Sequence, residues 1–189
     1  ASEGAIAAVA LGGGGAVVVS EEDVSAEELQ GRKIAFLATD GVEKVELEQP
    51  RAAVQDAGGH VDLLSVKTGE IAARNHDLEP AGTFVVDRAV ADARVEDYDG
   101  LVLPGGTVNA DKLRLERAAV DFVGAFLRSG KPVAAICHGP WLLAEADVLK
   151  GRTVTSFPSI KTDLQNAGAK WEDREVVCDE ALVTSRTPD

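Results

Sequence analysis

The stretch that decides the fold is Lys131-Pro-Val-Ala-Ala-Ile-Cys-His-Gly-Pro-Trp141. Residues 133–136 have the length and composition of a short buried strand, and an apolar helical run follows at 141–146. A strand that ends abruptly and turns into a helix presents one side chain at the carboxyl edge of a sheet. Backbone N–H groups and the positive end of the helix lie beneath that side chain. Here the presented residue is Cys137.

Cys137 is the candidate nucleophile. The usual elbow reads Gly-x-Ser-x-Gly, and here Ala135 and Gly139 place small residues on both sides of a thiol, with His138 beside it. A helix N-terminus lowers the pKa of a cysteine, and the thiolate is the reactive form. The alternative is that Cys137 is a small buried hydrophobic residue, as cysteines commonly are. The surrounding motif favours the nucleophile.

Strand and helix patterns alternate along most of the chain. Apolar runs predict buried strands at 33–38, 100–103 and 133–136, and further strands are predicted at 60–66 and 151–156. Helices are predicted over 42–58, 113–127, 141–146 and 159–167, with short peripheral strands or hairpins at 70–75, 83–86, 171–178 and 182–184. This order predicts an α/β fold: a doubly wound, mostly parallel sheet between helices, of the flavodoxin-like kind.

Three predicted strand ends carry unusual residues. Glu43 follows the first strand, Gly105-Gly106 follows residues 100–103, and Cys137-His138 follows the elbow strand. The carboxyl ends of strands are where such sheets bind ligands. We therefore expect the site at this edge.

Composition limits the classes of function. With 189 residues, 45% hydrophobic, the chain can bury the core of one domain. A formal net charge of −13 disfavours binding to nucleic acids and to anionic membranes, and is typical of a cytoplasmic protein. Two cysteines and three histidines without metal-ligand spacing argue against a disulfide framework and a metal site, and no cofactor is predicted.

Residues 1–28 differ from the rest. They are acidic, contain four consecutive glycines at 12–15 and include an apolar run that is too short and Gly-rich to span a membrane. We interpret them as a flexible extension; an extra strand or an oligomer contact is the alternative. Residues 29–189 are predicted to form a single domain. The closing Pro188-Asp189 is a typical helix opening, which predicts a further helix beyond it.

Several separated motifs together resemble the PfpI-type intracellular proteases of the ThiJ/PfpI superfamily, which have a class I glutamine amidotransferase-like fold. The resemblance covers residues 29–189. It rests on Ala38-Thr-Asp-Gly-Val-Glu43 with Glu46-Leu47, Leu103-Pro-Gly-Gly106, Lys112-Leu-Arg114, Lys131-Pro132, Ala135-Ile-Cys-His-Gly-Pro140 and Thr184-Ser-Arg186. Glutamine amidotransferases themselves need a later histidine, and none follows His138.

The resemblance implies roles for individual residues. Cys137 is the nucleophile with His138 beside it, and Glu43 shares a hydrogen bond with the sulfur. The backbone N–H groups of Gly106 and His138 form the oxyanion hole. The alternative for Glu43 is a helix first-turn acid without a role, because acids are favoured there.

In the protease-like relatives a glutamate from a neighbouring subunit orients the histidine. The aligned residue here is Asp111, which is one methylene shorter. Asp111 as an ordinary acid at a helix N-terminus is the rival interpretation. The resemblance also implies a homodimer or hexamer.

The function implied is that of a cysteine-dependent hydrolase in stress protection. Family members are described as peptidases, as deglycases that remove methylglyoxal or glyoxal adducts from proteins, and as cofactor-free glyoxalases. The expected partners are therefore small electrophilic carbonyl adducts or peptides, and the short loops after the strands favour the small adducts. The alternatives are a redox-responsive stress protein or chaperone with Cys137 as its oxidation sensor, and a non-catalytic dimeric scaffold.

Overall fold

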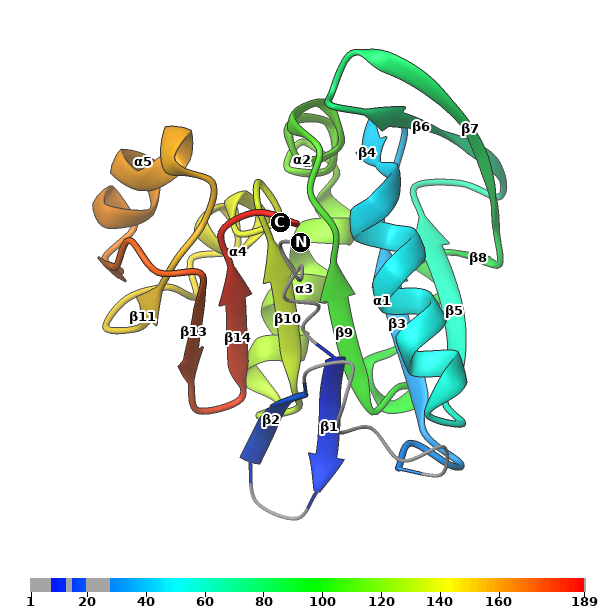
Figure 1. Ribbon diagram of the computed structural model, residues 1–189, viewed down its shortest axis with the longest axis horizontal. Helices are drawn as coiled ribbons and strands as arrows, with labels where there is room; N and C mark the ends of the chain where they lie inside the picture. The colour runs from blue at the N-terminus through cyan, green and yellow to red at the C-terminus, as the bar shows by residue number, and fades with distance from the viewer. Residues whose placement is uncertain (1–7, 13–14, 20–27, 189) are drawn as a thin grey trace, which may run out of the picture.

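The computed structural model describes residues 8–12, 15–19 and 28–188. Its central sheet has seven of the described strands, in the order β13 (Val176–Asp179), β14 (Leu182–Ser185), β10 (Val133–Ile136), β9 (Gly100–Leu103), β3 (Lys33–Leu37), β5 (His60–Ser65) and β8 (Arg88–Ala89) (Figure 1). All neighbours are parallel except β13, which runs antiparallel to β14 at one edge. The predicted α/β fold with a mostly parallel sheet is confirmed.

Helices cover both faces of this sheet. Helix α1 (Lys44–Asp56) lies on one face, and α3 (Arg117–Arg128) lies on the other (Figure 1). Along β3, Phe36 belongs to the core on the α1 side, whereas Leu37 belongs to the core that contains α3. Successive side chains of a strand point to opposite faces, so an unbroken apolar strand fills two cores at once. Shorter helices α4 (Trp141–Glu145) and α5 (Lys161–Asn166) follow β10 in the chain.

A smaller sheet stands at the carboxyl edge of the main one (Figure 1). It contains β4 (Val42–Glu43), β6 (Gly69–Asn75) and β7 (Glu79–Val86), in that order. This confirms the peripheral strands predicted between β5 and β9. One further pair, β11 (Thr153–Val154) and β12 (Lys170–Trp171), lies between β10 and β13 in sequence. The remaining short elements are the 3-10 turns η1 (Val90–Asp92), η2 (Val95–Asp97) and η3 (Pro158–Ile160).

The N-terminal region contains regular structure. Strands β1 (Ala8–Gly12) and β2 (Gly15–Val19) pair as an antiparallel hairpin, which corresponds to the alternative of extra strand structure. The interpretation of residues 1–28 as a flexible extension otherwise concerns residues 1–7, 13–14 and 20–27, which lie outside the described residues. No helix in the described part of the chain is long and apolar enough to cross a membrane.

The predicted helix over 113–127 is wrong at its start. A separate helix α2 (Thr107–Leu113) precedes it, and α3 begins only at Arg117, after a turn that leaves Leu115 82% exposed. Helix α2 is anchored by a buried polar residue. The Asn109 amide donates to the carbonyl oxygens of Pro104 and Gly105 and accepts the Thr39 N–H. With seven residues, of which only Ala110 and Leu113 are buried and apolar, α2 is too short to show the apolar periodicity by which helices are predicted.

Candidate active site

The chain makes the predicted sharp turn at Cys137, directly after β10. Cys137 has a φ of +59°, a left-handed conformation that is strained for any residue with a side chain. Two backbone hydrogen bonds hold it there: its N–H donates to the Ser185 carbonyl, and its own carbonyl accepts the Phe157 N–H, both at 2.9 Å. Gly139 completes the turn, because a side chain there would collide with the Leu103 carbonyl. Local strain stored in this way is typical of functional sites.

His138 lies beside the sulfur. Its Nδ1 is 3.3 Å from Cys137 Sγ, and the two residues are only 5% and 8% exposed. The ring of Phe157 stacks on the imidazole with centroids 4.8 Å apart, and Trp141 meets it edge-on. The imidazole is therefore packed on two sides, with one nitrogen directed at the thiol.

The acid that contacts the sulfur is Glu46, one helical turn after the predicted Glu43. Glu46 lies on α1, is 2% exposed and shares a hydrogen bond with the Cys137 thiol. Its Oε2 accepts the Gly105 N–H at 2.6 Å. Gly105 has to be a glycine, because a Cβ there would overlap both Glu46 and Cys137. The predicted contact between Glu43 and the sulfur is thus corrected.

Glu43 instead holds the turn between β6 and β7. Its two carboxyl oxygens accept the backbone N–H groups of His76 and Asp77, at 2.7 and 3.0 Å. Both acids belong to the quoted motif and stand three residues apart, so they project from the same side of the chain. The sequence motif contains both acids, and only the three-dimensional structure shows which of them reaches the sulfur.

The ionisable groups around the sulfur favour their neutral forms. Burial raises the pKa of Glu46 to about 8, although hydrogen bonds with Gly105 and Cys137 act in the opposite direction. Burial and the nearby Glu46 also raise the pKa of the Cys137 thiol, and burial lowers the pKa of His138. At neutral pH the site therefore rests as a thiol, a protonated carboxyl and a neutral imidazole.

This result differs from the expectation that a helix N-terminus lowers the thiol pKa. Helix α4 has only five residues, and the thiol is buried. Burial penalises the charged thiolate more than a short helix can offset. The sulfur must therefore lose its proton to a neighbouring base as it reacts.

Asp77 and Thr107 join the site although sequence reasoning did not select them. Asp77 Oδ1 accepts the Thr107 N–H, and its Oδ2 accepts the Thr107 hydroxyl, both at 2.8 Å. The Thr107 Oγ1 is 3.4 Å from His138 Nε2, and Ser159 Oγ is 3.1 Å from the same nitrogen. Asp77 lies in a peripheral turn, where an acid carries no motif that would identify it.

The other predicted site residues lie apart or line the cavity. Asp111 is exposed on α2, and its side chain makes no hydrogen bond or ion pair with any described residue. Gly106 has a φ of +92° and precedes α2; with Cys137 it lines a cavity of about 180 Å³. A Cβ on Gly106 would collide with the backbone of Gly41, so only glycine fits this turn. Its role in an oxyanion hole stays a prediction.

The cavity has an acidic lining. Glu43, Glu46 and Asp77 lie on its wall together with His76, and Phe157 and Pro188 provide apolar surface. Within residues 8–12, 15–19 and 28–188, no group of three His, Cys, Asp or Glu side chains could hold a metal ion. The chemistry available from the described side chains is nucleophilic attack with proton transfer.

Comparison with known proteins agrees with this geometry. Residues 32–189 match the model of the DJ-1/PfpI family. The chain belongs to the DJ-1/PfpI family. It is 40% identical over 159 residues to protein/nucleic acid deglycase 2 of Escherichia coli (strain K12), covering 84% of this chain and 90% of the relative. It is also 40% identical over 160 residues to general stress protein 18 of Bacillus subtilis (strain 168), covering 84% and 91%.

Solved structures of the DJ-1/PfpI family have the same architecture. A crystal structure of a two-domain protein from Anabaena variabilis ATCC 29413, with DJ-1/ThiJ/PfpI-like and ferritin-like domains, superposes with a TM-score of 0.77 at 35% identity. The match covers 82% of this chain and 43% of that longer one. The shared part is the DJ-1/PfpI domain fold.

Proposed function

We propose that this DJ-1/PfpI protein is a cysteine-dependent hydrolase whose nucleophile is Cys137. The observation that carries the proposal is the 3.3 Å contact between Cys137 Sγ and His138 Nδ1 at a strained elbow that opens into a cavity. In the first step the sulfur bonds to a carbonyl carbon of the substrate and the thiol proton moves to Nδ1. The carbonyl π electrons move onto oxygen, and the Gly106 N–H stabilises the resulting negative charge by donating a hydrogen bond to that oxygen.

The substrates that fit best are small neutral or cationic carbonyl compounds, including carbonyl adducts of amines. A cavity of about 180 Å³ is too small for much of a folded polypeptide. The acidic lining, with Glu43 and Asp77, repels an anionic substrate. A deglycase among the relatives supports the same choice. The protein is then expected to turn over methylglyoxal or its adducts in preference to the anionic aldehyde glyoxylate.

The role of Cys137 as an oxidation sensor has less support. Oxidation of a cysteine depends on thiolate character and exposure. Burial and Glu46 raise the pKa of this thiol, and Cys137 is 8% exposed. Attack with simultaneous proton transfer to His138 suits such a thiol better than oxidation by a diffusing oxidant does.

Mass spectrometry of a methylglyoxal-modified peptide tests the proposal. The peptide is incubated with the wild type, Cys137→Ala, Cys178→Ala and buffer. Cys178 is the matched control because it is the other cysteine and is exposed. We expect the wild type and Cys178→Ala to remove the adduct, and Cys137→Ala to be slower by about a hundredfold or more.

The other outcomes are equally clear. Cleavage of the peptide backbone by the wild type alone would change the reaction to that of a peptidase. Equal adduct loss in all four samples would remove the case for catalysis. Loss that disappears in Cys178→Ala would show simple trapping by the exposed thiol.

A further inference from the structure

A continuous series of hydrogen bonds leads from a carboxylate to the candidate base. Both oxygens of Asp77 bind Thr107, one through the backbone N–H and one through the hydroxyl. The Thr107 oxygen then lies 3.4 Å from His138 Nε2, and the opposite ring nitrogen, Nδ1, lies 3.3 Å from Cys137 Sγ. Every residue in this series belongs to one chain.

The direction of these bonds fixes where the imidazole proton sits. An ionised carboxylate only accepts hydrogen bonds, so the Thr107 hydroxyl donates its proton to Asp77. The Thr107 oxygen is then left as an acceptor toward His138. A neutral imidazole has one N–H, and an acceptor beside Nε2 favours that N–H on Nε2. Nδ1 keeps its lone pair, which faces the thiol.

We propose that Asp77, acting through the Thr107 hydroxyl, is the positioning residue that holds His138 in the tautomer able to accept the Cys137 proton. This assignment rests on the hydrolase proposed above and supplies its orienting acid from the same chain. Asp111, the residue aligned with the acid of a neighbouring subunit, is exposed and has no contact with His138. The lowered pKa of His138, caused by burial and only partly opposed by Asp77, keeps the ring neutral, as a choice of tautomer requires.

The turn that carries Asp77 has a left-handed backbone at two successive residues, a conformation that His and Asp adopt more often than most residues but still uncommonly. His76 and Asp77 have φ values of 52° and 65°, and two successive left-handed residues other than glycine are costly. The Glu43 carboxyl accepts both of their N–H groups. Glu43 therefore stabilises a strained turn, and this turn places the Asp77 carboxylate against Thr107. Strain that is held by specific contacts at a site indicates function.

Ser159 is the competing neighbour of Nε2. Its Oγ lies 3.1 Å from that nitrogen, and Ser159 itself is exposed. A serine hydroxyl can donate or accept, so by itself it selects neither tautomer. The Thr107 oxygen, in contrast, can only accept a hydrogen bond from His138, because the Thr107 hydroxyl already donates its hydrogen bond to Asp77.

Nitrogen-15 NMR of imidazole-labelled protein tests the tautomer directly and needs no substrate. The chain has three histidines, so His60→Gln and His76→Gln assign the His138 signals. We expect the wild type to carry the proton on Nε2. In Asp77→Asn the side-chain amide donates to Thr107, which frees the Thr107 hydroxyl to donate to Nε2, and the Nδ1-protonated form becomes populated.

Kinetics on the modified peptide supply the second readout. Asp77→Asn is expected to lower kcat by about a hundredfold with KM changed less than threefold, because orientation acts on the reaction step. Thr107→Val should give a similar loss and add little in the double variant with Asp77→Asn. Thr107→Ser, which keeps the hydroxyl, should restore most of kcat. Asp56→Asn, an exposed acid at the end of α1, and Thr83→Val, an exposed threonine on β7, are the matched controls.

An unchanged His138 tautomer in Asp77→Asn would overturn the proposal. A loss of kcat in Asp111→Asn together with a normal Asp77→Asn enzyme would also overturn it, in favour of an acid from a neighbouring subunit. If the wild type turns over no carbonyl substrate, the hydrolase proposal fails. The NMR result then still decides the role of Asp77.

Discussion

Two acidic side chains at opposite ends of the sheet show how differently one chain treats its carboxyl groups. Glu46 lies at the carboxyl edge beside Cys137, and Asp62 lies near the amino end of β5. Burial raises the pKa of Glu46 to about 8. Burial also acts to raise the pKa of Asp62, but hydrogen bonds from Tyr98, Lys33 and His60 outweigh it and lower that pKa.

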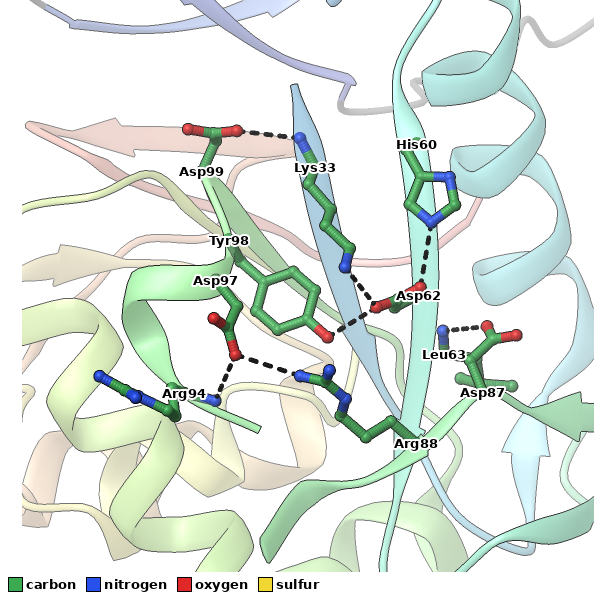
Figure 2. A network of polar contacts seen from close by, with 10 residues as sticks. All are labelled: Lys33, His60, Asp62, Leu63, Asp87, Arg88, Arg94, Asp97, Tyr98 and Asp99. Atoms are coloured by element: carbon green, nitrogen blue, oxygen red, sulfur yellow. Dashed lines mark hydrogen bonds and ion pairs between the residues drawn. The ribbon is translucent and has the colours of Figure 1, made fainter. Parts of the chain in front are cut away.

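The contrast follows from the partners that each acid has. Asp62 accepts a hydrogen bond from Tyr98 at 2.7 Å and pairs with Lys33 at 3.1 Å (Figure 2). The surrounding network also contains an Asp99 bond to the Lys33 N–H and an ion pair of Arg88 with Asp97. Glu46 forms no ion pair with any described residue.

The two environments have different effects: the partners of Asp62 stabilise the fold, whereas the surroundings of Glu46 influence the reactivity of Cys137. At the amino end, donors surround an ionised carboxylate and tie β3, β5 and the start of β9 together. At the carboxyl edge a carboxyl group is buried without a cation, which favours its protonated form. A protonated carboxyl beside the sulfur also avoids the repulsion that a carboxylate would exert on a thiolate. Burying Glu46 without a cation therefore costs free energy of folding at the site, whereas the partners of Asp62 offset its burial.

The largest effect is expected from Glu46→Gln, which removes the buried carboxyl group beside Cys137. The folded protein holds a proton on Glu46 at pH values where the unfolded chain has lost it. Wild-type stability should therefore fall as pH rises from about 4.5 to about 8, by roughly 3–5 kcal/mol from this group. Denaturant unfolding of Glu46→Gln should lack this fall. Glu48→Gln, exposed on the same helix, is the control and should keep it.

A smaller effect is expected from Tyr98→Phe, which weakens the hydrogen bonding of Asp62. The variant keeps the buried ring but loses the hydrogen bond to Asp62, and should be about 2 kcal/mol less stable at pH 7. Asp62 has a lowered pKa, so its stabilising charge is present at neutral pH and is lost as pH falls through the folded pKa. The loss should shrink in acid. A loss that stays equal to the loss at pH 7 even below the pH at which Asp62 takes up its proton in the folded protein would point to ring packing instead.

The smallest effect is expected from His60→Ala. His60 also contacts Asp62, at 3.1 Å, but its side chain is 67% exposed. Exposed ion pairs contribute little, so the change in unfolding free energy should stay below about 1 kcal/mol. A loss as large as that of Tyr98→Phe would mean that the exposed partner, and not the buried one, maintains the network.

The sequence predicted the central fold well because the buried strands are apolar on both faces. Residues 133–136 and 100–103 were placed to the residue, and the turn at Cys137 was expected from its flanking small residues. Helix α2 was missed because it has only seven residues, with Ala110 and Leu113 as its buried apolar positions, and Asn109 adds hydrogen bonds that no apolar pattern reveals. Apolar periodicity becomes recognisable only over several helical turns.

The site was predictable only in part. Cys137 and His138 are adjacent in sequence, so their contact follows from the elbow. The acid beside the sulfur could have been Glu43 or Glu46, since the two stand one turn apart, and the choice depends on how α1 packs. Asp77 meets Thr107 through a hairpin that folds back over the edge of the sheet, and no local pattern encodes that encounter.

The hairpin of β6 and β7 has a consequence for how this chemistry can vary. It is inserted between β5 and β8 and contributes no strand to the central sheet, yet its turn delivers Asp77 to the site. The nucleophile and the acid proposed to position its base therefore come from different sheets, although β6 and β7 share the core on the α1 side through Ile71 and Phe84. Exchanging the few residues between Asn75 and Glu79 offers protein engineers a way to retune reactivity while the scaffold stays the same.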